Sequence, residues 1–158
     1  MTRRTLLASA AALFSAAAAG ITSDRARGAT TYEVSFSEDE WKRRLSPEAF
    51  YVLREHGTEI AFSSPLDHET DAGIYKCAGC DLALFSSTTK FDSGTGWPSF
   101  WAPLPNALQQ SPNGSAFFGI EVHCRRCGGH QGHIFNDGPK PTGLRYCING
   151  VALKFVPK

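Results

Sequence analysis

The polarity pattern divides the chain into an apolar leader, two short amphipathic segments and a longer region of strand-like stretches. Ser37 and Glu40 have the spacing of a capping box, which predicts the start of a first helix. Pro47 is tolerated in the first turn of a helix and Gly57 is a common C-terminal stop, so these two residues bound a second predicted helix. Two short helices are therefore expected after the leader.

Beyond Gly57 the pattern changes to short β-rich stretches separated by glycine, proline, asparagine and serine. Short strands with frequent turns are typical of small antiparallel sheets. We therefore expect a mainly β fold made of a single domain, residues 30–158, which is long enough to bury a core. The predicted strands are residues 73–76, 82–85, 117–123, 133–135, 144–148 and 151–156.

Residues 1–29 have the pattern of an export signal. Arg3 and Arg4 precede an apolar run over residues 6–19, and small residues follow it up to Ala29. The arginine pair is typical of the twin-arginine route, although an ordinary export signal or a retained anchor would share most of the pattern. The run is short and alanine-rich for a membrane span, so we expect no stable membrane insertion. The signal would be cleaved, and the domain would work in a bacterial periplasm.

Charge is unevenly distributed between the leader and the rest of the chain. Residues 1–28 hold four of the 16 basic and one of the 15 acidic side chains, so the remainder carries 12 basic and 14 acidic side chains, a net charge of −2. Such a domain has no basic field to attract nucleic acid or an anionic membrane. We therefore expect no nucleic-acid partner.

Four of the five cysteines form two Cys-x-x-Cys pairs, Cys77 with Cys80 and Cys124 with Cys127. Two such turns bring four thiolates to one ion and leave no position for water, which predicts a structural zinc site. Two disulfides, or a redox-active Cys-x-x-Cys pair, are the alternatives in an exported protein. Zinc bound by both pairs would exclude thiol–disulfide exchange by either one.

The fifth cysteine, Cys147, is the candidate nucleophile. On a strand, Arg145, Cys147 and Asn149 point to the same face. A thiol between a guanidinium and an amide lies in an electropositive, hydrogen-bonding setting, so we expect a lowered thiol pKa and a larger thiolate fraction. The alternative is a lone cysteine that serves as a small buried hydrophobic residue.

Two histidines and two aromatic residues are candidates to complete a site around this thiol. His130 and His133 would be free for acid–base chemistry if the four paired cysteines hold the metal. On a strand His133 and Phe135 share a face, and a glycine-rich loop presents Trp97. Each of these residues taken alone could equally be a solvated or a core side chain.

Four segments together resemble the methionine-R-sulfoxide reductases, the type B family of these enzymes. The matching region extends from Trp41 to Phe155, nearly the whole expected domain. The resemblance implies two small antiparallel sheets in a tent-like arrangement, with the active site on one face and a structural zinc at the far side. The segments are Tyr-Lys-Cys-Ala-Gly-Cys at 75–80, Lys-Phe-Asp-Ser-Gly-Thr-Gly-Trp-Pro-Ser-Phe at 90–100, His-Gln-Gly-His-Ile-Phe at 130–135 and Gly-Leu-Arg-Tyr-Cys-Ile-Asn at 143–149.

The same resemblance implies a reaction, the reduction of the R epimer of methionine sulfoxide in proteins or peptides. Cys147 would attack the sulfoxide sulfur and become a sulfenic acid, while His130 and His133 bind and protonate the departing oxygen. The rival interpretation is a binding module that uses the same groove for an unmodified ligand and needs no reactive thiol.

By this resemblance, Trp97 and Phe135 would enclose the S-methyl group of the substrate, and Arg145 and Asn149 would hold the thiolate and the polar side of the pocket. One departure from the family pattern is Thr95, which stands where many members have a resolving cysteine. A hydroxyl cannot form a disulfide, so we expect an external thiol reductant, a thioredoxin-like protein or a dithiol, to resolve the sulfenic acid. We expect the enzyme to be a monomer.

Overall fold

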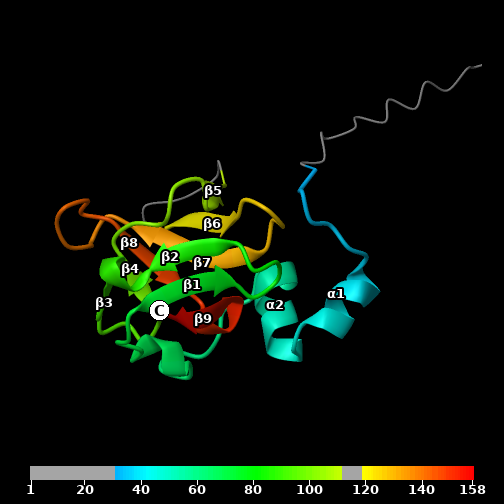
Figure 1. The fold of residues 1–158 in the computed structure, drawn as a ribbon, viewed down its shortest axis with the longest axis horizontal. Helices are drawn as coiled ribbons and strands as arrows, with labels where there is room; N and C mark the ends of the chain where they lie inside the picture. Colours follow the sequence, from blue (N-terminus) through cyan, green and yellow to red (C-terminus); the bar gives the residue numbers. More distant parts are fainter. Residues whose placement is uncertain (1–30, 112–118) are drawn as a thin grey trace, which may run out of the picture. The chain divides into compact units, whose positions relative to one another are not determined.

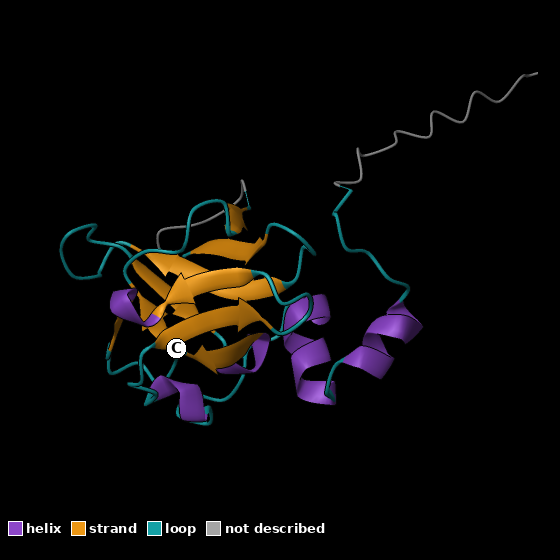
Figure 2. Ribbon diagram, viewed as in Figure 1, coloured by secondary structure: helices purple, strands orange, loops and turns teal. Residues whose placement is uncertain are grey.

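Two antiparallel β-sheets and two helices make up the described part of the chain (Figure 1, Figure 2). The structure is a computed structural model and describes residues 31–111 and 119–158. The expected export signal at 1–29 and the beginning of the strand expected at 117–123 lie outside these residues. Within them, no helix is both long enough and apolar enough to cross a membrane. The helices are α1 (Glu38–Arg44) and α2 (Pro47–Glu55), and the 3-10 turns are η1 (Pro65–Asp67), η2 (Ser87–Thr89) and η3 (Gly150–Ala152).

Both helices begin where the sequence predicts. The hydroxyls of Ser37 and Ser46 each accept a hydrogen bond from the backbone N–H three residues further on, at 3.3 and 3.1 Å. The second helix ends with His56 as its cap rather than with Gly57. His56 adopts the left-handed conformation, with φ of 58°. This turn brings the His56 imidazole within hydrogen-bonding distance of Glu121.

The strands form a three-stranded sheet of order β2-β1-β9 and a six-stranded sheet of order β3-β4-β8-β7-β6-β5. The prediction of a mainly β fold with two antiparallel sheets is confirmed, although η3 shortens the last predicted strand. The strands β3, β4 and β5 were not predicted, because two or three residues are too few to show an alternating pattern. The strands are β1 (Gly73–Cys77), β2 (Ala83–Ser86), β3 (Lys90–Phe91), β4 (Ser99–Phe100), β5 (Leu108–Gln110), β6 (Ile120–Cys124), β7 (His130–Phe135), β8 (Arg145–Ile148) and β9 (Leu153–Pro157).

Aromatic side chains join the two sheets. Tyr75 and Phe85 come from the three-stranded sheet and meet Phe100 of the six-stranded sheet, with ring centroids 4.9 and 4.2 Å from that of Phe100. All three side chains are fully buried. Burial of a side chain of this size contributes about 2 kcal/mol relative to leaving it exposed. This packing holds the six-stranded sheet in place as the platform for the functional residues.

The register of the six-stranded sheet places four polar side chains in one row. Cys147 in β8 is paired with Ser99 in β4 on one side and with His133 in β7 on the other. His133 is in turn paired with Glu121 in β6. Directly paired residues project from the same face of a sheet, with Cβ atoms about 5 Å apart. The sheet therefore sets a thiol, an imidazole and a carboxylate side by side.

Candidate active site and cysteine cluster

A small cavity of about 150 Å³ opens beside Cys147. Trp97 and Phe135 supply its aromatic walls, and His133 supplies an imidazole next to the thiol. The cavity contains five of the seven residues proposed from the sequence for catalysis and substrate binding, and the other two, His130 and Arg145, are not part of its lining. The full lining is Thr58, Trp97, Gly132, His133, Phe135, Cys147 and Asn149.

A wider depression of about 370 Å³ lies along η1 and β3. Acidic side chains such as Asp67 and Asp92 line it, together with Lys90 and His68. It contains no cysteine, whereas a reactive thiol and perturbed titratable groups converge on the smaller cavity. We therefore take the smaller cavity as the candidate active site.

The half-buried thiol of Cys147 lies at the end of a chain of hydroxyl groups. Thr95 Oγ1 lies 4.0 Å from its sulfur, Ser93 Oγ lies 2.8 Å from Thr95 Oγ1, and Ser99 Oγ lies 2.7 Å from Ser93 Oγ. Burial raises the pKa of the Cys147 thiol above its ordinary value, although the charge of Arg145 and the hydroxyl of Thr95 act to lower it. The expectation of a lowered pKa is therefore wrong, because desolvation outweighs the nearby positive charge.

A carboxylate and an aromatic ring hold the guanidinium of Arg145. It donates two hydrogen bonds to Asp137, both 2.8 Å long, and lies 4.5 Å from the ring centroid of Phe135. The hydrogen bond to Asp137 raises the pKa of Arg145, and the hydrogen bond from Arg145 lowers the pKa of Asp137. Arg145 thus keeps its charge and supports Phe135, one wall of the cavity. Asp137, which the sequence reasoning did not propose, completes this arrangement.

The amide of Asn149 holds two backbone segments together. Its Oδ1 accepts a hydrogen bond from the N–H of Glu59 at 2.9 Å, and its Nδ2 donates to the carbonyl of Gln131 at 3.0 Å. Glu59 in turn accepts the indole N–H of Trp97 through its carbonyl at 3.2 Å, and its carboxylate accepts two backbone N–H groups of η3. Asn149 lies just beyond β8 as the cap of η3, so the predicted strand alternation does not extend to it. Glu59, another residue missed from the sequence, positions Trp97.

His130 and His133 have different surroundings. His133 lines the cavity and is paired directly with Cys147 on the neighbouring strand. The side chain of His130 is only 2% exposed, and its ring centroid lies 5.3 Å from that of His133. Nδ1 of His130 lies 2.8 Å from Oε1 of Glu121. Its Nε2 has no hydrogen-bond partner among residues 31–111 and 119–158. Glu121, a third residue missed from the sequence, therefore fixes the orientation of His130.

Burial and hydrogen bonding set the charges of these groups. Burial lowers the pKa of both His130 and His133 below the ordinary value. Burial also acts to raise the pKa of Glu121, but hydrogen bonds from His130, Ser111 and His56 outweigh it and lower that pKa to about 2. Glu121 is thus a carboxylate at neutral pH.

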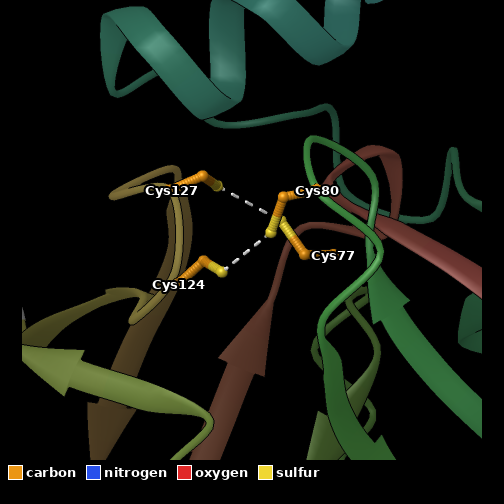
Figure 3. A group of neighbouring side chains, drawn as sticks. All are labelled: Cys77, Cys80, Cys124 and Cys127. Carbon is orange, nitrogen blue, oxygen red and sulfur yellow. Dashed lines mark hydrogen bonds between the residues drawn. The ribbon is translucent and has the colours of Figure 1, made fainter. Parts of the chain in front are cut away.

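The four paired cysteines converge from two turns, one between β1 and β2 and one between β6 and β7 (Figure 3). The sulfurs of Cys77 and Cys127 are 3.7 Å apart, and those of Cys80 and Cys124 are 3.5 Å apart. Four sulfurs around a tetrahedral zinc ion lie about 3.8 Å from one another, whereas a disulfide requires about 2.05 Å. All five cysteines are free thiols here. The arrangement fits a structural zinc ion and contradicts the two-disulfide alternative.

Gln131 connects the cysteine cluster to the cavity. Its Nε2 donates hydrogen bonds to the sulfur of Cys77 at 3.5 Å and to the carbonyl of Gly129 at 3.3 Å. The backbone carbonyl of Gln131 accepts hydrogen bonds from the side-chain amide and the backbone N–H of Asn149. One buried residue therefore contacts a cysteine of the cluster and a residue that lines the cavity.

A half-buried thiol next to an imidazole in an aromatic-walled cavity is the arrangement of a candidate thiol-dependent enzyme, and the separate cysteine cluster is compatible with a structural zinc ion. Comparison with known proteins agrees: the model of the SelR domain matches residues 45–157. The chain is 50% identical over 126 residues to the peptide methionine sulfoxide reductase MsrB of Leptospira interrogans, covering 78% of this chain and 96% of that protein. It is 52% identical over 124 residues to MsrB of Methanosarcina barkeri, covering 77% of this chain and 87% of that protein. The chain belongs to the MsrB family of peptide methionine sulfoxide reductases, as its motifs predicted.

Proposed function

We propose that this protein reduces the R epimer of methionine sulfoxide in proteins or peptides to methionine. The observation that carries the proposal is the position of Cys147 opposite His133, in a cavity walled by Trp97 and Phe135. The aromatic side of this cavity suits an S-methyl group and the imidazole side suits a sulfoxide oxygen, so the two faces of a chiral sulfur are distinguished. Membership of the MsrB family supports the R epimer.

The first step is an oxygen transfer to Cys147. The Cys147 thiol gives its proton to His133, and the thiolate attacks the sulfoxide sulfur to form a transient S–S bond. His133, assisted by His130, passes the proton to the sulfoxide oxygen, and the S–O and S–S bonds break as the hydroxyl moves to the Cys147 sulfur. The substrate gains two electrons and leaves as a thioether, while the Cys147 sulfur loses two electrons and ends as a sulfenic acid. The positive charge of Arg145 favours the thiolate against the cost of burial.

The second step returns Cys147 to the thiol with an external reductant. One external thiol attacks the sulfenic sulfur and releases water, and a second thiol displaces Cys147 from the resulting mixed disulfide. Two observations support this route: Thr95, not a cysteine, lies beside the Cys147 sulfur, and the other four cysteines converge on one another. Intact-mass and peptide mapping after one equivalent of substrate would detect a Cys147 sulfenic acid, and an intramolecular disulfide would contradict the route.

We also propose that zinc is held by Cys77, Cys80, Cys124 and Cys127, and that its role is structural. Four thiolate ligands leave no open position for water or substrate. The ion would join the turn of the three-stranded sheet to the turn of the six-stranded sheet, and no step of the reaction passes through it. About one zinc ion per chain is expected by metal analysis, and a metal-free folded protein would exclude the role.

For residues 1–29 we propose a cleaved twin-arginine signal that delivers the enzyme to the periplasm. The Arg3-Arg4 pair and the apolar run after it support this route. The double substitution Arg3→Lys and Arg4→Lys is expected to keep the protein in the cytoplasm with its signal uncleaved. Export at the wild-type level would exclude the twin-arginine route.

The decisive experiment measures turnover of the separate R and S epimers of a dabsylated methionine sulfoxide with dithiothreitol, for the wild type and Cys147→Ser. We expect reduction of the R epimer only, and a loss of about a thousandfold or more in the variant, because serine is a far weaker nucleophile. Matched zinc content and melting temperature would show that the variant is folded. If neither epimer reacts with the zinc-loaded wild type, the Cys147 cavity is a binding site that does not reduce methionine sulfoxide.

A further inference from the structure

We propose that His56, Glu121 and His130 form a second metal site, which takes a divalent first-row transition-metal ion and switches the reductase off when it is filled. The three side chains come from the cap of α2, from β6 and from β7. Nδ1 of His56 and Nδ1 of His130 lie 2.7 and 2.8 Å from the same Oε1 atom of Glu121, and one ligand atom from each of the three residues lies within 4.8 Å of the other two.

The ligand types indicate the kind of ion. Two ligand atoms at about 2.1 Å from one ion are about 3.0 Å apart at a right angle and about 3.4 Å apart at the tetrahedral angle. The hydrogen bonds of His56 and His130 to Glu121 are 2.7 and 2.8 Å long, so these side chains need to move apart by less than about 1 Å to bind one ion. Two imidazoles and a carboxylate are nitrogen and oxygen ligands that suit nickel(II) or copper(II), whereas the thiolates of the cysteine cluster suit zinc.

An ion can reach this site from solvent. The side chain of His56 is 63% exposed and that of Glu121 is 23% exposed, while His130 forms the buried end of the group. The two imidazoles are not paired with separate acids: both converge on one carboxylate oxygen. An ion placed between them would replace two hydrogen bonds by three metal–ligand bonds, as the Nδ1 protons of the two rings move to Nε2 or to solvent.

Occupancy of the site would act on the active site through His130. Its ring centroid lies 5.3 Å from that of His133, which lines the Cys147 cavity. An imidazole bound to a metal through Nδ1 cannot become an imidazolium, so His130 would lose its ability to supply a proton to the departing oxygen. The inhibition, but not the metal binding, rests on the proposed reductase function.

Nickel(II) is a suitable probe because it does not oxidise the Cys147 thiol. Calorimetric titration of the untagged, zinc-loaded full chain with nickel(II) is expected to show one nickel ion per chain in addition to zinc. His56→Asn should weaken this binding by about tenfold or more, because one of three ligands is lost. Asparagine tolerates the left-handed backbone of His56, so the fold is retained. The matched control is His68→Asn, which removes an exposed histidine outside the group and should bind as the wild type does.

A second readout identifies the ligands directly. The chain has five histidines, and paramagnetic nickel should broaden the ring signals of His56 and His130 most strongly in the NMR spectrum. Broadening centred on His68 or His123, or nickel affinity unchanged in His56→Asn, would overturn the site. No nickel binding by the wild type would overturn it as well.

The third measurement is reductase turnover in the presence of nickel. Nickel should inhibit the wild type and His68→Asn at the concentrations that fill the site, and should leave His56→Asn active. Full activity of nickel-saturated wild type would overturn the inhibitory role. If the protein proves to have no reductase activity at all, calorimetry and NMR still decide the metal site, so the two failures are distinguishable.

Discussion

The cysteine cluster and the Cys147 cavity place cysteine sulfurs in opposite kinds of surroundings. The cluster brings four sulfurs together from two short turns, with contacts of 3.5 and 3.7 Å and three of the four cysteines buried. The cavity keeps a single sulfur apart, half-buried, and surrounds it with hydroxyls, an imidazole and aromatic rings. Convergence of thiolates suits a structural ion, whereas isolation beside proton donors suits redox chemistry. The setting, not the residue type, thus separates structure from reactivity.

Replacing one cysteine by serine in each region should give the largest difference between the two regions. Cys124→Ser removes a ligand from the cluster and is expected to lose the metal and lower the melting temperature by more than about 10 °C, because structural zinc sites bind with about 10 kcal/mol or more. Cys147→Ser should change the melting temperature by less than about 3 °C. Calorimetry with metal analysis measures both. Equal melting temperatures would mean that the cluster carries no structural ion.

A smaller but still large effect is expected at Gly132, where the cavity depends on close contact between β7 and β8. A Cβ at this position would lie 2.0 Å from the carbonyl oxygen of Cys147, a backbone atom that cannot rotate away. We expect Gly132→Ala to cost about 3 kcal/mol in urea unfolding, as overpacking does. The control is Gly143→Ala, which also has a positive φ but meets no heavy atom within 4 Å among the described residues. It should cost only about 1 kcal/mol, and similar losses in both variants would contradict the steric explanation.

A substitution at Gln131 tests whether the cysteine cluster and the Cys147 cavity are coupled. Gln131→Leu keeps the shape of the side chain but removes the hydrogen bonds to Cys77 and Gly129. We expect metal affinity to fall by about tenfold, as for other changes next to a metal ligand. Turnover should change less than about threefold, because the carbonyl of Gln131 still holds Asn149. Metal competition with a chelator and steady-state kinetics measure the two effects, and a large loss of turnover would show that the regions are coupled.

The smallest expected effect is on the pH dependence of stability. His130 and His133 have lowered pKa values, so the unfolded chain binds more protons below about pH 6.5 and stability falls as the pH falls through that value. Glu121, with a pKa of about 2 against an ordinary 4.5, contributes stability that is present above pH 4.5 and is lost towards pH 2. In Glu121→Gln the second loss should be absent. Urea midpoints between pH 7 and pH 3, followed by fluorescence, compare the slopes, and parallel curves would contradict this assignment.

Local patterns were sufficient to predict the two helices and the longer strands, and they single out the candidate reactive residues. The capping serines Ser37 and Ser46, the two Cys-x-x-Cys turns and the strand around Cys147 each depend on residues within a few positions of one another. The two-residue strands β3 and β4 could not be predicted, because they form only by pairing with each other and with β8. Their stability comes from neighbours distant in the sequence.

The supporting residues of the site were missed for a similar reason. Glu59 and Glu121 are ordinary acidic residues in the sequence, and only tertiary packing sets Glu59 against Asn149 across 90 positions and Glu121 between two histidines. The prediction of a lowered pKa for the Cys147 thiol was wrong, because the positive charge of Arg145 is visible in the sequence whereas the desolvation of Cys147 is not. Charge is a property of the residue, but burial is a property of the fold.

By itself the sequence determined the β-rich class, the cysteine pairs, the candidate nucleophile and the family, because short-range patterns and residue chemistry carry that information. The tertiary structure alone decided which groups surround each sulfur. Strand register set His133 opposite Cys147, and the joining of two distant turns collected four thiols. The physical reason is that hydrogen-bonded register and desolvation arise only when segments far apart in the chain are packed together.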